Sequence, residues 1–365
     1  MNLLEIAKHF QIQGTPHAVI PHGNGHIHDT YRIHTAPETP DYILQRVNSS
    51  VFRQVAQVMS NIQVVTEHIR QRLLQSEATD LERRSLQLVL THDHKSYYQD
   101  HAGKYWRMYV YVPRSKALEM VNTTAQAYEI GRAFGQFECW VSDLAASKLV
   151  DTIPDFHHVG RRLLRLEYVY RENVAQRARE VQEAVAYIRD LAEPMGRVLR
   201  LGLEGKLPRR VTHNDTKFNN VLLDEATEKS LCVVDLDTVM SGYLQYDFSD
   251  GIRTVANVAA EDEQDISKIY VDLDRFEAYA RGFLSELEEI TSGEVQELVP
   301  SAALMPYVLS VRFLTDYLEG DVYFKTAFPA HNRQRGLAQL QLVRSIQAEQ
   351  HRLQERINRM LDKVQ

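Results

Sequence analysis

Cysteine is scarce in this chain, excess positive charge is absent, and long apolar runs are missing. Only two of the 365 residues are cysteines, Cys139 and Cys232. Two thiols build neither a disulfide framework nor a zinc site, because each needs more clustered ligands. Both cysteines have apolar neighbours, so we expect buried thiols in a reducing compartment.

The charge balance and the apolar pattern exclude two further classes of protein. The formal net charge is −7 at pH 7, whereas a nucleic-acid surface usually carries a basic excess. No apolar run approaches the roughly 20 residues of a membrane span. Residues 1–10 mix charged with apolar side chains, which is typical of an amphipathic helix and not of a signal peptide. We therefore expect a cytoplasmic protein without a membrane or nucleic-acid partner.

The remaining composition, 44% hydrophobic and 25% charged, is that of a globular protein, and the length suits two domains. Apolar and alternating runs in the first part predict five strands, at residues 18–21, 30–33, 42–47, 86–90 and 105–111. One amphipathic helix, at residues 51–74, follows the third strand. Pro113 ends the last strand, because proline cannot donate to a sheet ladder.

Helical periodicity dominates the rest of the chain. Helices are predicted over residues 123–141, 163–191, 195–203, 275–287, 303–319 and 337–364. The many arginines of residues 163–203 are interpreted as a solvated polar face. The sequence thus predicts a small β-rich lobe at residues 1–112 and a larger, mainly helical lobe at residues 113–365.

The most informative stretch runs from residue 211 to residue 250. Within it, His213, Asp215, Lys217 and Asn220 form an H-x-D-x-K-x-x-N pattern, and Asp235 follows the apolar run 231–234. The order and spacing are typical of the catalytic and metal-binding loops of phosphoryl-transfer enzymes. A bland alternative exists, because H-x-D is common by chance and residues 221–235 are compatible with a plain hairpin. The complete string favours the catalytic interpretation, which its structural context must test.

Each part of phosphoryl transfer has a candidate in this stretch. The reaction needs an oriented hydroxyl, a metal that bridges the phosphates, and positive charge near the transferred group. Asp215 can orient the hydroxyl and take its proton, and Lys217 can reach the γ-phosphate. Asn220 and Asp235 offer the oxygen ligands that suit Mg²⁺. His213 is expected to brace the loop.

Three further acids in the stretch are less certain in role. Asp237 is compatible with an acid beside the metal, a direct sugar ligand, or a cap for the following turn. Asp247 and Asp250 are expected to hold the catalytic loop through backbone N–H groups.

Near the N-terminus, a turn with two glycines spans residues 23–28. Glycines allow backbone N–H groups to approach a phosphate closely. By itself the turn is equally explained as a plain hairpin, and only the downstream motif favours a phosphate role.

Together these motifs resemble the aminoglycoside phosphotransferase-like kinase family, and more narrowly the N-acetylhexosamine 1-kinases. The wider resemblance rests on H-N-D-T-K-x-N-N at residues 213–220, V-D-L-D-T at 234–238 and Y-D-F-x-D at 246–250. The narrower one rests on G-x-G-H-I at residues 23–27, Y-I-L-Q at 42–45 and R-F-L-x-D-Y-L-E-G-D-x-Y-F at 312–324. The resemblance covers nearly the whole chain, and its last segment is the most specific.

The resemblance implies an α+β, two-lobed protein-kinase-like fold, ATP with Mg²⁺, and phosphorylation of the anomeric hydroxyl of N-acetylglucosamine or N-acetylgalactosamine. It assigns the base role to Asp215 and the metal roles to Asn220 and Asp235. It assigns nucleotide contacts to the glycine turn and the third strand, at Gly23, Gly25, His26, Ile27, Gln45 and Arg46. Substrate contacts fall to Asp237, Arg312 and Tyr323.

The two C-terminal substrate contacts have structural alternatives. A guanidinium and a phenol can both hydrogen-bond sugar oxygens. However, Arg312 stands one helical turn before Asp316, which suits an ion pair, and Tyr323 is compatible with a core aromatic.

One departure from the wider kinase pattern concerns the third strand. Kinases usually place a phosphate-binding lysine there, paired with a helix glutamate, whereas this chain has Gln45 followed by Arg46. Strand side chains alternate, so only one of the two can face the nucleotide. Either a neutral or arginine contact replaces the lysine, or the phosphate clamp is built differently. Glu67, the only carboxylate of residues 51–74, receives no role.

Two other functions compete with the sugar kinase. A kinase for another small acceptor, such as an aminoglycoside or a choline-like compound, would need acids or an aromatic cage around a cation. A nucleotide-binding protein without catalysis is disfavoured, because Asp215, Lys217, Asn220 and Asp235 are all present. The pattern carries no signal for an oligomeric state.

Overall fold

A computed structural model describes residues 2–23, 27–76 and 79–362, which fall into two compact units. Unit 1 comprises Met1–Ala117, Trp140–Ile153 and Val221–Ser241, and unit 2 comprises Leu118–Cys139, Pro154–Asn220 and Gly242–Gln365. The predicted β-rich lobe lies within unit 1. Two later segments of the chain also belong to this unit, and the second of them carries Asp235 and Asp237.

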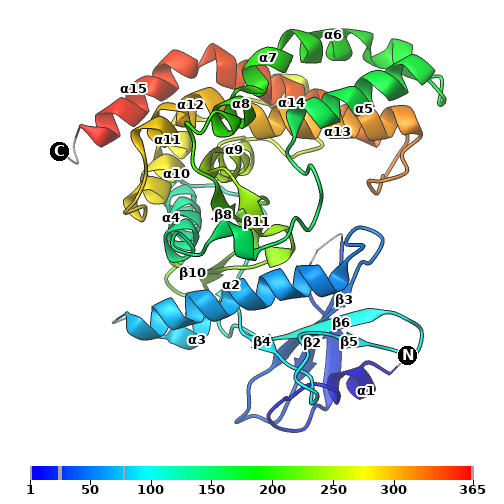
Figure 1. The fold of residues 1–365 in the computed structure, drawn as a ribbon, viewed down its shortest axis with the longest axis vertical. Coiled ribbons are helices and arrows are strands. Elements are labelled where there is room, and N and C mark those ends of the chain that lie inside the picture. Colours follow the sequence, from blue (N-terminus) through cyan, green and yellow to red (C-terminus); the bar gives the residue numbers. More distant parts are fainter. Residues whose placement is uncertain (1, 24–26, 77–78, 363–365) are drawn as a thin grey trace. The chain divides into compact units, whose positions relative to one another are not determined.

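Unit 1 is built on an antiparallel sheet in the order β1-β2-β3-β6-β4, with β5 also paired to β6 (Figure 1). The strands are β1 (Ala18–Pro21), β2 (Asp29–His34), β3 (Tyr42–Val47), β4 (Leu88–Val89), β5 (Tyr98–Gln99) and β6 (Tyr105–Val110). All five predicted strands are present. The sequence missed β5, because a strand of two residues is too short for alternation to show.

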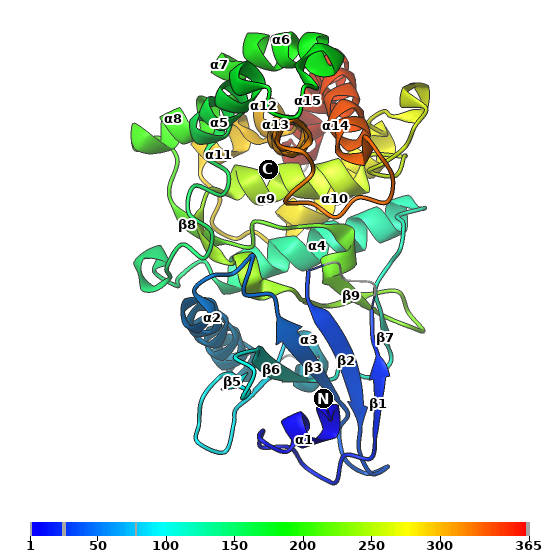
Figure 2. The same ribbon diagram turned by 90° about the vertical axis from the view of Figure 1, so that its right-hand side faces the viewer.

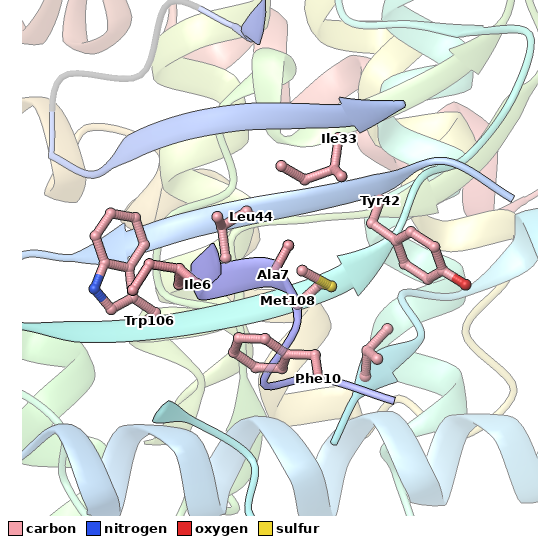
Figure 3. Packing of buried hydrophobic residues seen from close by; sticks show 9 residues of the cluster. Ile6, Ala7, Phe10, Ile33, Tyr42, Leu44, Trp106 and Met108 are labelled. Carbon is pink, nitrogen blue, oxygen red and sulfur yellow. The ribbon is translucent and has the colours of Figure 1, made fainter. Parts of the chain in front are cut away.

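One face of this sheet packs on the N-terminal helix α1 (Leu3–Ala7). Figure 3 shows Phe10 and the α1 side chains against Leu44 of β3 and Met108 of β6. Because strand side chains alternate, the residues next to these, Gln45 and Arg107, point to the opposite face. On that face Arg107 Nη1 lies 4.0 Å from Met59 Sδ.

Met59 belongs to α2 (Val55–Gln75), the predicted long helix of unit 1. Its buried residues include Val58, Ile62 and Val65 at the predicted helical spacing. The helix begins four residues later than predicted. The preceding residues form a turn in which Ser50 N–H donates to Asn48 Oδ1 at 3.0 Å, and such side-chain bonds compete with helix formation.

The remaining elements of unit 1 include the segment Val221–Ser241, which carries Asp235. A second antiparallel sheet has the order β10-β9-β7. Its strands are β7 (Ser115–Lys116), β9 (Val221–Asp224) and β10 (Ser230–Val233), and short helices are α3 (Leu81–Arg84), η1 (Ala146–Lys148) and η4 (Leu236–Thr238). All four residues of β10 are buried, so the apolar run before Asp235 forms a buried strand. Strand β11 (Met240–Gly242) ends the segment.

Unit 2 is mainly helical (Figures 1 and 2). Its first elements are α4 (Thr124–Trp140), α5 (Val159–Glu172), η2 (Ala178–Val181), α6 (Gln182–Asp190), α7 (Ala192–Met195), α8 (Arg197–Leu203), strand β8 (Arg210–Thr212) and η3 (Phe218–Asn220). Its later elements are α9 (Leu244–Val255), η5 (Ile266–Lys268), α10 (Leu273–Ser285), α11 (Ser292–Gln296), α12 (Leu298–Ser301), α13 (Leu304–Glu319), α14 (His331–Ala348) and α15 (Gln350–Leu361).

Two predicted helices of unit 2 are each divided in the structure. The predicted helix 163–191 is interrupted after α5, where Asn173 adopts a left-handed conformation with φ 46° and caps the helix. The predicted helix 337–364 is divided between α14 and α15 at Glu349. Apolar periodicity continues across both breaks, so it did not reveal them.

Helix α13 forms the centre of unit 2 and packs against α5, α9 and α14. Together with α12 it covers Leu298–Glu319, which is long and apolar enough to cross a membrane by length and composition alone. This corrects the expectation that no apolar run approaches that length. Of its most apolar stretch, 83% is buried inside the protein, as in a core helix.

Glycines allow α4 and α10 to approach each other unusually closely. A Cβ atom at Gly131 of α4 would lie 2.1 Å from the carbonyl oxygen of Tyr279, which no side chain tolerates. Gly282 of α10 meets the Tyr128 carbonyl oxygen at the same distance. The close crossing helps to fix α4, whose other side chains reach the catalytic loop.

Candidate functional site

The predicted catalytic loop lies in unit 2, between β8 and η3. Lys217 Nζ lies 3.0 Å from Asp215 Oδ2, and Asn220 Nδ2 donates to the Asp215 backbone oxygen at 2.8 Å and to Oδ2 at 3.2 Å. The structure therefore brings these three predicted residues together. Burial alone would raise the pKa of Asp215, but the Lys217 charge and His213 hold it below the usual value. Asp215 is thus an anion that can accept a proton.

His213 is fully buried and makes contacts that fit a bracing role. Its ring packs edge-on against Phe134 and Phe137 of α4, with ring centres 5.6 and 5.5 Å away. Its Nδ1 lies 3.3 Å from the Asp215 backbone nitrogen, whose N–H group donates to it. The ring therefore fixes the backbone that carries Asp215.

Asp247 of α9 holds the same loop from the other direction, as predicted. Its carboxylate accepts from the backbone N–H groups of His213 at 2.6 Å and Asn214 at 2.7 Å. Asp250 differs from the prediction. It pairs with Arg253 at 2.7 Å, one helical turn further along α9.

A second buried acid, Glu138 of α4, accompanies Asp247. Only 2% of Glu138 is exposed. Burial and the neighbouring Asp247 charge raise the pKa of Glu138 well above its usual value. Burial of two neighbouring carboxyl groups favours one proton on the pair. We place that proton on Glu138, because the two backbone donors favour the ionised form of Asp247.

The raised pKa of Glu138 makes stability depend on pH. The free energy that protonated Glu138 contributes is fully present below its unfolded pKa of about 4.5, and it is lost as pH rises through the higher folded pKa. Glu138→Gln keeps a donor to Asp247 but cannot ionise. As pH rises above the unfolded pKa, the fall in the free energy of unfolding should therefore be shallower in the variant, by up to about 1.4 kcal/mol per pH unit.

Urea unfolding at several pH values measures this difference. Glu183→Gln, at an exposed position in the first turn of α6, is the matched control and should follow the wild type. Parallel pH profiles for Glu138→Gln and the wild type would show that Glu138 is ionised in the folded protein.

On α13, Arg312 does not form the ion pair that its spacing allows. The Arg312 guanidinium lies over the rings of Phe156, Phe324 and Tyr323, at 5.1, 5.3 and 5.8 Å from their centres. Asp316 instead accepts from the backbone N–H groups of the loop that follows α13, which are those of Val322 (2.9 Å), Tyr323 (2.7 Å) and Phe324 (2.9 Å). The ion-pair alternative is therefore wrong.

Tyr323 is 53% exposed, so the alternative of a core aromatic is also wrong. The three N–H groups that Asp316 binds hold the loop in which Tyr323 stands. Burial lowers the pKa of the Arg312 guanidinium, and the neighbouring Tyr323 phenol offsets part of this effect. The two predicted substrate contacts are thus adjacent.

Sequence reasoning missed Arg162 of α5, which lies beside Arg312. Its Nε and Nη2 donate to the Phe156 carbonyl oxygen at 3.2 and 3.0 Å. Burial and the nearby Arg312 charge lower the pKa of Arg162 to about 10. Across the described residues, no carboxylate lies within 4 Å of either guanidinium. The two cations therefore interact with the Asp155 and Asp215 carboxylates only at longer range.

His157 is a second residue without a sequence signal. Its Nε2 lies 3.1 Å from the Asn214 carbonyl oxygen, next to Asp215 in the chain. Burial and the Arg312 charge lower the pKa of His157 to about 3, so the ring is neutral and Nε2–H donates. Together Asp247, His213 and His157 fix three consecutive residues that end at Asp215.

In unit 1, the glycine turn is only partly described. Gly25 and His26 lie outside the described residues. Gly23 has φ 73°, a conformation that favours glycine, and Ile27 is 42% exposed. His28 follows the turn, and its Nδ1 accepts from the Asn48 backbone N–H at 3.1 Å.

The side chains of Gln45 and Arg46 lie on opposite faces of β3 and have different partners. Arg46 pairs with Asp29, which is directly opposite on β2. Gln45, on the other face, donates from Nε2 to Thr30 Oγ1 at 3.0 Å and accepts from Arg107 Nε at 2.9 Å. Both polar ends of Gln45 are therefore engaged within the sheet.

Asp237 forms a buried ion pair with Arg107. Nη1 and Nη2 of Arg107 donate to Oδ1 and Oδ2 of Asp237 at 2.7 and 2.6 Å, and the two side chains are only 1% and 2% exposed. Burial alone would raise the pKa of Asp237, but the Arg107 charge holds it far below the usual range. Sequence reasoning missed Arg107, because nothing in the spacing connects β6 with a residue 130 positions later.

Three potential metal ligands of unit 1 lie close together: His28, Asp235 and Asp237, with ligand atoms within 4.8 Å of one another. His28 does not suit a metal, because Nδ1 accepts a backbone hydrogen bond and Nε2 therefore carries the proton. Both oxygens of Asp237 are bound by Arg107. Asp235, the ligand predicted from the sequence, is the third member of the group.

Each unit offers one predicted Mg²⁺ ligand with an oxygen donor, Asp235 in unit 1 and Asn220 in unit 2. Asp235 follows a buried strand and has φ 62°, a strained value for a residue other than glycine that often marks a functional position. In unit 2 Asn220 uses its Nδ2 group on Asp215, which assigns its oxygen Oδ1 the role of an acceptor. A carboxylate and an amide oxygen are the hard ligands that Mg²⁺ prefers.

The fold is shared with solved structures of small-molecule kinases. A spectinomycin phosphotransferase in complex with ADP and spectinomycin is 13% identical, with a TM-score of 0.57 over 93% of this chain and 98% of that one. An aminoglycoside phosphotransferase from Alicyclobacillus acidocaldarius is 12% identical (TM-score 0.61, 97% and 95% covered). A choline kinase from Cryptosporidium parvum is 13% identical (TM-score 0.53, 93% and 94% covered). These likenesses confirm the two-lobed protein-kinase-like fold.

A match between the sequence and a protein-family model shows the family of the chain. Residues 18–282 match the model of the phosphotransferase enzyme family, which is well over half of the chain. The match includes the loop around Asp215 and the segment around Asp235, where the site residues were predicted. The protein therefore belongs to the phosphotransferase enzyme family and is a small-molecule kinase.

Proposed function

We propose that this kinase phosphorylates the anomeric hydroxyl of an N-acetylhexosamine, N-acetylglucosamine or N-acetylgalactosamine, and forms the sugar 1-phosphate in the cytoplasm. ATP is the phosphoryl donor. Asn220 and Asp235 would hold Mg²⁺, which neutralises charge on the phosphates when it is bound. Nucleotide contacts are assigned to Gly23, Gly25, His26 and Ile27, and to whichever of Gln45 and Arg46 on the third strand faces the nucleotide.

The catalytic step is assigned to Asp215. Its carboxylate is ionised and oriented by Asn220, so it can accept a hydrogen bond from the C1 hydroxyl and take the proton as the oxygen attacks phosphorus. Lys217, 3.0 Å from Asp215, would provide positive charge toward the transferred phosphoryl group. Most of the catalysis then comes from positioning and electrostatics.

The single observation that carries the choice of acceptor is the pair of arginines beside this carboxylate. Arg312 interacts with the Asp215 charge, and Arg162 adds a second cation that interacts with the Asp155 charge. Such a region repels choline or an aminoglycoside, because both are cations. The hydroxyl and acetamido oxygens of a neutral N-acetyl sugar can instead accept from both guanidinium groups and from Tyr323. The specific 312–324 resemblance supports the same acceptor.

Asp237 was considered as a direct sugar ligand. Because Arg107 binds both of its oxygens, we assign it to the support of the metal-binding segment and leave the sugar contacts to Arg312, Arg162 and Tyr323.

Release of ADP from Mg-ATP across a panel of acceptors tests the proposal. The panel contains N-acetylglucosamine, N-acetylgalactosamine, glucose, glucosamine, choline and spectinomycin. We expect turnover with the N-acetyl sugars and a product without a reducing end, because the phosphate occupies C1. Turnover with choline or spectinomycin and none with any sugar would contradict the proposal.

Glucosamine, which carries a charged amine at neutral pH, isolates the contribution of the arginines. The wild type should prefer N-acetylglucosamine over glucosamine, and Arg312→Met or Arg162→Met should weaken this preference while the KM for ATP stays unchanged. Arg171→Met, at an exposed position near the end of α5 (75% exposed), is the control. An equal rise in the KM for ATP and for sugar would argue against acceptor contacts.

A further inference from the structure

Arg107 is a buried cation at the centre of unit 1 that the catalytic assignments leave unexplained. It lies on β6, directly opposite Gln45 of β3, and Gln45 lies directly opposite Thr30 of β2. Hydrogen bonds of 2.9 and 3.0 Å connect the three side chains in a row across β6, β3 and β2, which are neighbours in the sheet. At the end of the row, the Arg107 guanidinium binds Asp237.

Stability alone is a weak reason for such an arrangement. Taking two charges out of water is costly, and replacing a buried ion pair by apolar residues of similar volume is often neutral or stabilising. The pair instead orients the Asp237 carboxylate. A guanidinium that donates two parallel hydrogen bonds fixes both the position and the plane of a carboxylate. The fixed carboxylate belongs to η4, which directly follows Asp235.

Other contacts also hold the segment after Asp235, among them those of His28 and Asn61. His28 Nε2, which carries the proton, lies 3.5 Å from Asp237 Oδ1. Asn61 of α2 donates to the carbonyl oxygens of Val239 and Val150 at 2.9 and 2.8 Å. Asp235 itself has a left-handed backbone, and such strain persists only where the surroundings enforce it. Arg107 makes the strongest of these contacts.

The row also explains the missing lysine of the third strand. In protein kinases that lysine pairs with a helix glutamate. Here Gln45 occupies the strand position, and Glu67 of α2 accepts from Gln63 at 2.8 Å in an exposed pair. The buried positive charge of the sheet is found one strand away, on β6, and its partner is the acid two residues after Asp235.

We propose that Arg107 is a positioning residue for metal binding, which acts through Asp237 to hold Asp235 in the conformation that coordinates the metal. The proposal needs only the kinase chemistry of Asp235 and is independent of the acceptor. Gln45 and Thr30 hold the Arg107 side chain in its plane.

The test measures metal binding and folding separately from turnover. Mn²⁺ binding in the presence of ADP is followed by the electron paramagnetic resonance signal of free Mn²⁺, and folding by urea unfolding. The main variant is the double replacement Arg107→Met with Asp237→Leu, which removes both charges and keeps apolar volume. We expect it to fold and to bind Mn²⁺ about 10- to 100-fold more weakly, as is usual when a residue supporting a ligand is lost.

Arg107→Lys is the second variant, because it keeps the charge and loses the two-pronged contact. It should bind Mn²⁺ more weakly than the wild type and more tightly than the double variant. Arg83→Lys is the matched control. Arg83 is another buried arginine of unit 1 and pairs with Asp224 at 2.6 Å, so its replacement should change unfolding and leave Mn²⁺ binding unchanged.

Two outcomes overturn the proposal. One is a folded double variant that binds Mn²⁺ as the wild type does, which would make the pair purely structural. The other, decisive if the double variant does not fold, is wild-type Mn²⁺ affinity in Arg107→Lys. A wrong acceptor assignment gives a different result, namely no turnover of N-acetyl sugars by the wild type whatever the Mn²⁺ affinities.

Discussion

Asp215→Asn is expected to lower turnover by about 10²- to 10⁴-fold, the usual contribution of a positioned general base. The amide keeps the size of the side chain but cannot take a proton from the acceptor hydroxyl. It also removes the negative charge that Lys217 faces at 3.0 Å. Because no nucleotide contact is assigned to Asp215, the dissociation constant of ATP should change little. Steady-state turnover and calorimetric titration with ATP measure the two quantities.

Asp190→Asn is the matched control, since Asp190 is exposed at the end of α6, and it should retain wild-type turnover. A turnover for Asp215→Asn within a few-fold of the wild type would exclude Asp215 as the base. If ATP binding were lost together with turnover, the substitution would have disturbed the site as a whole.

The parts of the site that the sequence predicted are those that lie close together in the chain. Asp215, Lys217 and Asn220 fall within six residues, so their spacing reflects one loop, and the structure places them in contact. Asp247 was also predicted, because a buried acid that follows a polar loop commonly binds its N–H groups. The relative positions of catalytic side chains can be predicted from one sequence when the residues lie within one short loop.

Contacts between distant segments were not predictable in this way. Arg107 and Asp237 are 130 residues apart, and Arg162 and Arg312 are 150 residues apart. Arg162 also stands in an arginine-rich amphipathic helix, where a solvated face was the natural interpretation. Periodicity reports which face of a helix is apolar, but it does not report which polar residue another helix will cover.

The presence of the strands and helices was easier to predict from the sequence than the residues at which they begin and end. The five strands and the long helices follow from apolar periods of two and 3.6 residues. The breaks at Asn173 and Glu349 were missed, because the apolar pattern continues on both sides of each. Asp316 was read as a partner of Arg312 from helical spacing, whereas its side chain serves the loop beyond the helix.

Replacement of Asp316, which binds the loop after α13, is expected to lower the stability of the protein strongly. The Asp316 carboxylate, in a residue only 2% exposed, accepts from three backbone N–H groups and from Asn332 Nδ2 at 2.9 Å. In Asp316→Asn one oxygen becomes an NH₂ group, which must face N–H donors. Hydrogen bonds to a charged acceptor are worth about 1.5–3 kcal/mol each, and an unsatisfied buried donor adds its desolvation cost. We expect the free energy of unfolding to fall by roughly 2–4 kcal/mol.

The same substitution should affect the acceptor more than the nucleotide. The three N–H groups belong to the loop that holds Tyr323 beside Arg312, so its release should raise the KM for the sugar about tenfold or more, equivalent to roughly 1.4 kcal/mol, while the KM for ATP stays near the wild-type value. Glu319→Gln is the control on the same helix, because it removes only the partially exposed pair with Arg165 and such pairs contribute little. If Asp316→Asn unfolded at the wild-type urea concentration, or raised both KM values equally, the carboxylate would not be what shapes the acceptor side of the site.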